Sequence, residues 1–125
     1  MAKTILIVDD SASLRRVVDI ALSGAGYEVI QASDGKDALA KLAKLDGRKV
    51  HLIVSDVNMP NMNGIEFVTA VKKDAAYKFT PVIMLTTEGQ DEVKDQGRAA
   101  GAKAWIVKPF NPTQLLNAVQ KLILP

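Results

Sequence analysis

Three carboxylates follow apolar runs in this chain. Asp9 and Asp10 come directly after residues 5–8, and Asp56 comes directly after residues 52–55. If both runs are parallel strands of one sheet, their carboxyl ends lie on the same edge and the carboxylates share one crevice. Carboxylates held together repel one another, which favours a bound divalent cation with oxygen ligands. The pattern predicts a metal site in which Asp56 is a carboxylate nucleophile able to form an acyl phosphate.

Hydroxyl and ammonium groups follow two further apolar runs. Thr86 and Thr87 come after residues 82–85, and Lys108, followed by Pro109, comes after residues 105–107. A lysine placed opposite the carboxylates suits an anion that is also held by the metal. Together, the four run ends outline a site that handles one phosphoryl group.

Each of these residues also has an ordinary structural explanation. Aspartate is a favoured helix N-cap, so Asp9 or Asp10 could cap the helix that follows, although a cap needs only one acid. Asp56 precedes a loop rich in Asn, Pro and Gly, where aspartate often forms a turn. Threonine hydroxyls commonly bond to loop backbone, and lysine is commonest on surfaces. The functional interpretation therefore depends on the joint order and spacing of the residues.

Five apolar runs alternate with five longer amphipathic segments, which predicts βαβ units and a parallel sheet covered on both faces. We expect strands at residues 4–8, 28–31, 52–55, 82–85 and 104–107. The expected fold class is α/β: a doubly wound (βα)5, flavodoxin-like fold with a parallel sheet of order 2-1-3-4-5. In that order the crevice opens between the first and third strands.

The intervening segments show helical periodicity. The first helix carries one apolar stripe made of Leu14, Val17, Val18, Ala21 and Leu22, and it stops at Gly24 and Gly26. The fourth helix, expected at about residues 91–100, has a weak apolar face that includes a glycine, Gly97. A glycine inside a helix costs about 1 kcal/mol relative to alanine. We expect this helix to be the least firmly held element.

The bulk composition indicates one globular domain over residues 1–125. The net charge of +2 comes from scattered lysines and arginines, which argues against a nucleic-acid-binding surface. The absence of cysteine excludes disulfides and thiolate sites. The chain has no apolar stretch long enough for a membrane helix and begins directly with a strand-like run, so we expect a cytoplasmic protein. We interpret His51, the single histidine, as structural.

These motifs resemble those of the receiver domain of two-component response regulators over essentially the full chain, and most closely those of the stand-alone chemotaxis regulators. The residues that carry the resemblance are Asp9, Asp10, Asp56 within Asp56-Val57-Asn58-Met59-Pro60, Thr86, and Lys108-Pro109-Phe110. The set is specific because each member falls at the expected strand end.

The resemblance implies a Mg²⁺ site and a phosphoacceptor. Asp10, Asp56 and the backbone carbonyl of Asn58 would bind Mg²⁺ directly, and Asp9 would bind it through water. A phosphohistidine on a partner histidine kinase of the CheA-like chemotaxis type would donate its phosphoryl group to Asp56. Transfer of this kind needs charge neutralisation on the phosphoryl oxygens and an in-line nucleophile.

The resemblance also implies residues that sense the phosphoryl group. Lys108 would pair with one phosphoryl oxygen, the amide of Thr87 would donate to another, and the Thr86 hydroxyl would turn inward. The side chains of Asn58 and Glu88 would tune hydrolysis of the acyl phosphate.

An aromatic residue on the fifth strand couples to this threonine in the family. That position holds Trp105, where tyrosine or phenylalanine is more typical, and the larger indole with its N–H need not bury in the same pocket. A half-buried aromatic of an edge strand is the structural alternative. The family also has a cis Lys–Pro bond at the position of Lys108-Pro109. Asn63 replaces an aspartate common before Gly64, which we expect to affect only the loop turn.

The expected function is that of a monomeric phosphorylation switch that catalyses only its own phosphorylation and dephosphorylation. Phosphorylation would shift the face formed by the fourth helix, fifth strand and fifth helix toward a flagellar motor switch protein or another phospho-dependent target, and a partner phosphatase is possible. A haloacid-dehalogenase-type phosphatase is the alternative from another class, but it needs a second acid where Asn58 stands. A receiver that acts as a phosphate relay or sink is a further alternative, whereas a DNA-binding regulator would need a recognition helix.

Overall fold

Five parallel strands form one sheet in the order β2-β1-β3-β4-β5. The computed structural model describes residues 2–87 and 91–125. The strands are β1 (Thr4–Val8), β2 (Glu28–Ala32), β3 (Leu52–Asp56), β4 (Val82–Thr86) and β5 (Ala104–Val107). The helices are α1 (Ala12–Gly24), α2 (Gly35–Lys44), α3 (Gly64–Lys72), α4 (Asp91–Ala100) and α5 (Pro112–Leu122). The predicted α/β fold and its strand order are confirmed.

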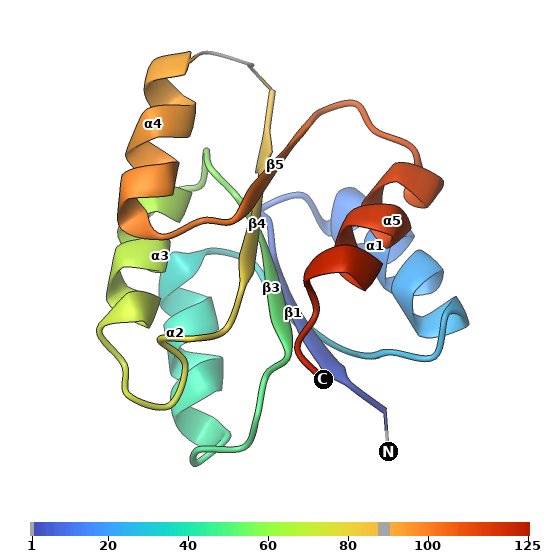
Figure 1. The fold of residues 1–125 in the computed structure, drawn as a ribbon, viewed down its shortest axis with the longest axis horizontal. Coiled ribbons are helices and arrows are strands. Elements are labelled where there is room, and N and C mark those ends of the chain that lie inside the picture. The colour runs from blue at the N-terminus through green and yellow to red at the C-terminus, as the bar shows by residue number, and fades with distance from the viewer. Residues whose placement is uncertain (1, 88–90) are drawn as a thin grey trace.

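The sheet lies between two layers of helices (Figure 1), with α1 and α5 on one face and α2, α3 and α4 on the other. Along each strand successive side chains point to opposite faces. On β1, for example, Ile5 and Ile7 join the cluster beneath α1 and α5, whereas Leu6 and Val8 join the cluster beneath α2 and α3. The central strands are therefore apolar on both faces, which explains why their sequences do not alternate.

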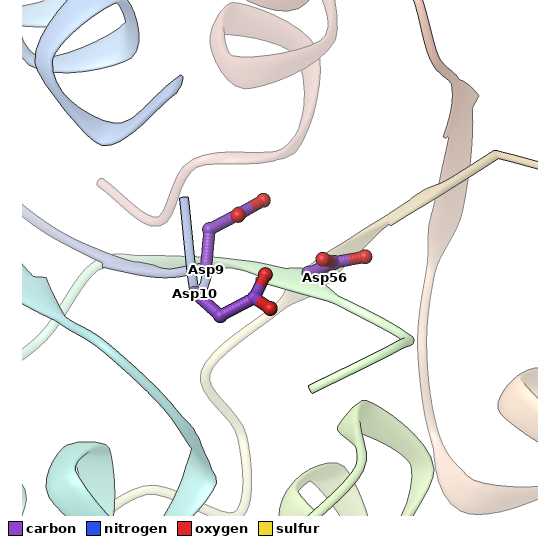
Figure 2. A group of neighbouring side chains, drawn as sticks. All are labelled: Asp9, Asp10 and Asp56. Carbon is purple, nitrogen blue, oxygen red and sulfur yellow. The ribbon is translucent and has the colours of Figure 1, made fainter. Parts of the chain in front are cut away.

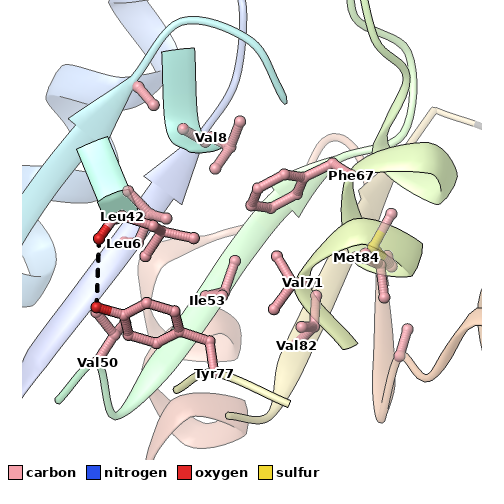
Figure 3. Packing of buried hydrophobic residues seen from close by; sticks show 14 of the residues in the cluster. Leu6, Val8, Leu42, Val50, Ile53, Phe67, Val71, Tyr77, Val82 and Met84 are labelled. Carbon is pink, nitrogen blue, oxygen red and sulfur yellow. Dashed lines mark hydrogen bonds between the residues drawn. The ribbon is translucent and has the colours of Figure 1, made fainter. Parts of the chain in front are cut away.

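The cluster on the α2 and α3 side includes Phe67 (Figure 3), a residue with no exposed surface. Tyr77 closes its lower end, and its hydroxyl donates to the carbonyl oxygens of Arg48 at 3.0 Å and Leu42 at 3.4 Å. Trp105 and Ala100 pack against the same cluster from β5 and α4. This packing ties the fifth strand to the helical layer that covers it.

Three strands are one residue longer than predicted. β2, β3 and β4 extend to Ala32, Asp56 and Thr86, so Asp56 and Thr86 are the last residues of their strands instead of the first residues of the loops. The extension continues the ladder: Asp56 pairs with Leu85 in register, and the Val57 N–H donates to the Leu85 carbonyl at 3.0 Å. The backbone around Asp56 is thus held as strand.

The fourth helix has the predicted bounds, and its sequence is mostly polar. Among residues 95–100, whose surroundings the structure describes, Gly97 alone is buried and Ala100 is partly buried.

Within the two described ranges, no helix combines the length and the apolar character needed to cross a membrane.

Candidate functional site

Asp9, Asp10 and Asp56 lie together at the carboxyl ends of β1 and β3 (Figure 2). Each contributes a carboxylate oxygen, and these oxygens lie within 4.8 Å of one another. The two strands are neighbours in the sheet, with Val8 paired to Ser55, so the sheet order brings together residues that are far apart in the sequence. The grouping predicted for these three aspartates is what the structure contains.

Asp9 is completely buried, and its side chain accepts two hydrogen bonds. The Ser11 N–H donates to Oδ1 at 2.8 Å, and the Lys108 ammonium donates to Oδ2 at 2.9 Å. The capping alternative for the acidic pair is wrong, because Ser11 is the N-cap of α1 and accepts from the Leu14 N–H. Asp10 is exposed.

Lys108 reaches the carboxylates from the end of β5. Its Nζ lies 2.9 Å from Oδ2 of Asp9 and 3.2 Å from Oδ2 of Asp56, and its N–H donates to the Thr86 carbonyl at 2.7 Å. The Lys108–Pro109 peptide bond is cis, as the resemblance implied. One ammonium group is thus shared between two buried carboxylates.

The pKa values of Asp56 and Lys108 are both raised above their usual values. Burial raises the pKa of Asp56 above its usual value, and the neighbouring Asp9 charge raises it further, against the opposing effect of Lys108. Burial alone would lower the pKa of Lys108, but its hydrogen bond to Asp9 and the charges of Asp9 and Asp56 outweigh burial and raise it. Lys108 therefore stays protonated among the carboxylates.

The charges of the cluster leave it suited to a divalent cation. Three carboxylates and one ammonium group carry two formal negative charges in excess. Carboxylate and carbonyl oxygens are the ligands that hard cations such as Mg²⁺ take. The exposed position of Asp10 gives the cluster an open side toward solvent. The aspartate cluster can therefore hold such an ion.

The other predicted site residues lie around this cluster. Asn58 is exposed, and its N–H donates to Oδ1 of Asp56 at 3.3 Å. Thr86 is buried at the end of β4. Thr87 is exposed, and together with Ser11, Lys108 and Phe110 it lines an open cavity of about 410 Å³ beside the carboxylates. Glu88 lies outside the described residues.

Three further residues have contacts that the sequence patterns did not reveal. The N–H of Gly64 donates to the Val57 carbonyl at 2.8 Å, which closes the loop after Asp56. Asn63 is the N-cap of α3 and forms a capping box with Glu66, so its role extends beyond the loop turn. Gly97 of α4 lies against Trp105, the residue that replaces the more typical tyrosine or phenylalanine on β5.

His51 lies at the opposite ends of the strands from the acidic cluster. Its Nδ1 accepts a hydrogen bond from the Thr4 N–H at 2.9 Å, and its own N–H donates to the Thr4 carbonyl at 2.8 Å. The ring thus fixes the start of β1 beside β3. This is the structural role expected from the sequence.

The arrangement has a counterpart among known proteins. The response regulator receiver domain family matches residues 5–120 of the chain. The chain belongs to this family. It is a receiver domain, a signalling module of two-component systems and not an enzyme of the conventional kind.

The chain is similar to several chemotaxis regulators. It is 40% identical to chemotaxis protein CheY1 of Helicobacter pylori, over 96% of this chain and 95% of that protein. The solved structure of the chemotaxis response regulator CheY4 of Vibrio cholerae superposes with a TM-score of 0.91 at 51% identity, covering 98% and 99% of the two chains. The receiver domain is therefore of the CheY type.

Another relative has a different output. The phosphate regulon transcriptional regulatory protein PhoB of Pseudomonas aeruginosa is 38% identical over 98% of this chain, which spans only 52% of that protein. The receiver fold therefore does not by itself specify what the signal controls.

Proposed function

We propose that this receiver domain is the phosphoacceptor of a chemotaxis-type phosphorelay, with Asp56 as the acceptor. The observation that carries the proposal is the sharing of the Lys108 ammonium between Asp9 and Asp56 at the carboxyl ends of β1, β3 and β5. It supports a site for an anion beside a nucleophilic carboxylate, because the ammonium is within reach of both the carboxylate and a group attached to it.

In the proposed reaction an Asp56 carboxylate oxygen attacks the phosphorus of a phosphohistidine on a partner kinase. The new O–P bond forms as the P–N bond breaks, and the histidine nitrogen leaves with the electron pair. Two groups around Asp56 favour this step. The Lys108 ammonium can pair with the oxygens of the transferred group, and the Asn58 N–H donates to one oxygen of the Asp56 carboxylate. We assign the phosphate contacts to Lys108, the Thr87 amide and the Thr86 hydroxyl.

The metal in this proposal is Mg²⁺, held by Asp10, Asp56 and the Asn58 carbonyl, with Asp9 acting through water. When bound, it would supply charge neutralisation for the phosphoryl oxygens. Loss of the group follows by attack of water on phosphorus, which breaks the O–P bond, releases inorganic phosphate and restores the Asp56 carboxylate. Asn58, at the exposed side of the cluster, and Glu88 are the residues we propose to tune that rate.

The output surface in this proposal is the face of α4, β5 and α5. Thr86 and Val107 are paired in the sheet, and Trp105 lies two residues before Val107 on the same strand. A movement of the Thr86 side chain or backbone would therefore act directly on β5. We propose a flagellar motor switch protein as the target, a CheA-like histidine kinase as the donor and a cytoplasmic location for the protein. A phosphate relay or sink is the alternative within the family.

The test is to add a small phosphodonor such as acetyl phosphate with Mg²⁺ and to weigh the intact protein over time. We expect a transient gain of one phosphoryl group that Asp56→Asn abolishes. Asp46→Asn, which removes the same charge at an exposed loop position, should gain the group normally. Continuous turnover of phosphate monoesters without a labelled protein would instead indicate a phosphatase of the haloacid-dehalogenase type.

The target and the donor need a separate experiment. Binding of the phosphorylated and the unphosphorylated protein to a motor switch protein can be compared directly. Phosphorylation-dependent binding supports a motor output. Return of the phosphoryl group to the kinase, without a difference in binding, supports a phosphate sink.

A further inference from the structure

Gly97 faces the indole of Trp105 from inside α4. A Cβ at Gly97 would lie 2.2 Å from both Cη2 and Cζ2 of Trp105, and 3.3 Å from Cδ1 of Ile65. The first two distances are far below van der Waals contact, and the atoms belong to a rigid ring and not to the tip of a flexible chain. No side chain fits at this position unless the indole or the helix moves.

The same glycine also binds, through its backbone, the two residues that follow α4. Its carbonyl accepts from the Gly101 N–H at 3.0 Å and from the Ala102 N–H at 2.9 Å. Gly101 has a φ of 117°, and the Gly101 N–H also bonds to Arg98, as in a Schellman termination. Backbone hydrogen bonds therefore fix the end of α4 to the short segment that leads into β5, the strand that carries Trp105.

Gly97 also explains how the indole of Trp105 fits at its position on β5. Trp105 is half-buried and packs against the cluster beneath α2 and α3. The ring extends far enough to meet the backbone of α4, so the helix at that point must lack a side chain. Alanine would otherwise be preferred inside a helix.

We propose that Gly97 is the positioning residue for Trp105, and that their contact makes the position of α4 depend on that of the indole. A receiver with this pair would move α4 whenever the indole moves, and the reverse. The contact itself does not depend on phosphorylation. Only its use as part of the switch rests on the proposed function.

The first test uses the fluorescence of Trp105, the one tryptophan of the chain, in the unphosphorylated protein. Gly97→Ala should shift the emission to longer wavelength and increase quenching by acrylamide, because the indole is displaced from the helix. Gly24→Ala is the matched control, since a Cβ there meets nothing within 4 Å, and its spectrum should not change. An unchanged spectrum in Gly97→Ala would overturn the proposal.

The second test is a double-mutant cycle on urea unfolding, which remains informative if the displaced ring also weakens the fold. Gly97→Ala should lower the unfolding midpoint of the wild type. In a Trp105→Phe background it should raise the midpoint, because the shorter side chain does not reach Gly97 and alanine is the better helix former. An equal effect of Gly97→Ala in both backgrounds would contradict the assigned contact.

The last measurement separates this inference from the proposed function. Gly97→Ala should still gain a phosphoryl group at Asp56 in the mass assay, while its emission responds less to phosphorylation than that of the wild type. If the wild type gains no phosphoryl group, the proposed function fails and the first two tests still decide the role of Gly97. If the two proteins respond equally to phosphorylation, Gly97 has no part in the switch.

Discussion

Gly64 lies so close to Asp56 that a Cβ on the glycine would be 2.1 Å from the Asp56 carbonyl oxygen. The same Cβ would lie 2.7 Å from Cε of Met84 and 2.9 Å from Cα of Val57. The first turn of α3 thus packs tightly against the backbone of Asp56 and Val57. The backbone of Asp56 can take its position only because Gly64, at the end of the following loop, has no side chain.

Replacing this glycine should damage both the fold and the site. Since backbone atoms cannot yield as a side chain can, Gly64→Ala should lower the free energy of unfolding by about 2 kcal/mol or more, as overpacked core positions do. Urea unfolding measures the stability, and the mass assay measures phosphorylation, which should slow. Gly24→Ala, in open space, is the control, and equal stability of the two variants would show that the contact is not tight.

The ammonium of Lys108 should stabilise the protein when no metal is bound. Lys108→Met leaves the buried Asp9 carboxylate without its cation, which should lower the free energy of unfolding by about 1–3 kcal/mol in chelator at neutral pH. Urea unfolding of Lys103→Met, at an exposed position, is the control. A loss no greater than that of the control would mean that Asp9 does not need Lys108.

Mg²⁺ should raise the stability of the wild type, because in the proposed function it would bind the folded chain and not the unfolded one. The gain should reach about 2.7 kcal/mol at a concentration of 100 times Kd. Asp10→Asn should weaken binding by about tenfold or more, equivalent to about 1.4 kcal/mol, without destabilising the protein in chelator, since it relieves repulsion.

Thermal unfolding with Mg²⁺ or with a chelator measures both effects of that substitution. Asp46→Asn makes the same change in charge at a residue with a φ of 52°, a conformation that asparagine accepts. It should respond to Mg²⁺ as the wild type does. A response of Asp10→Asn equal to that of the control would remove Asp10 from the metal site.

Acidification should weaken the fold through His51. Burial of the ring, with Lys49 and Lys3 nearby, holds the pKa of His51 below its usual value. The unfolded chain therefore takes up the proton first, so stability is complete above about pH 6.5 and falls as the pH drops toward the folded pKa. His51→Asn keeps an acceptor for the Thr4 N–H without titrating. Its urea midpoint should fall less between about pH 6.5 and 5.5 than that of the wild type, and parallel curves would assign the effect elsewhere.

Phosphorylation should change the emission of Trp105. The indole lies on β5, the strand paired with Thr86, so inward movement of the threonine should alter its surroundings. The measurement is the emission spectrum before and after addition of phosphodonor and Mg²⁺, with Asp56→Asn as the control. An unchanged spectrum in protein shown by mass to be phosphorylated would exclude Trp105 from the switch.

The sequence was sufficient to predict the sheet and the residues gathered at its edge. Apolar runs mark buried strands, and parallel strands bring their carboxyl ends together, so the positions of Asp9, Asp10 and Asp56 along the chain were enough to group them. The strand limits were less accurate, because ladder hydrogen bonds such as that from Val57 to Leu85 extend β3 by one residue. Such bonds depend on a neighbouring strand and leave no local signal.

Other contacts were not predicted because they join residues far apart in the chain. Gly97 appeared only as a weak point of its helix, and its contact with Trp105 depends on how α4 lies over β5. Ser11, and not an aspartate, proved to be the cap of α1. Both contacts depend on which residues lie close together in the folded protein, and sequence periodicity does not contain that information.

The bond between Lys108 and Asp9 joins residues 99 positions apart. Since it exists only when the first and last strands are both in place, no fragment or partly folded chain can assemble the acidic site with its ammonium group. Contacts of such long sequence separation form late and slowly in folding. The protein should therefore become able to accept a phosphoryl group only when folding is complete. Nascent or damaged copies of the protein would then take no part in signalling.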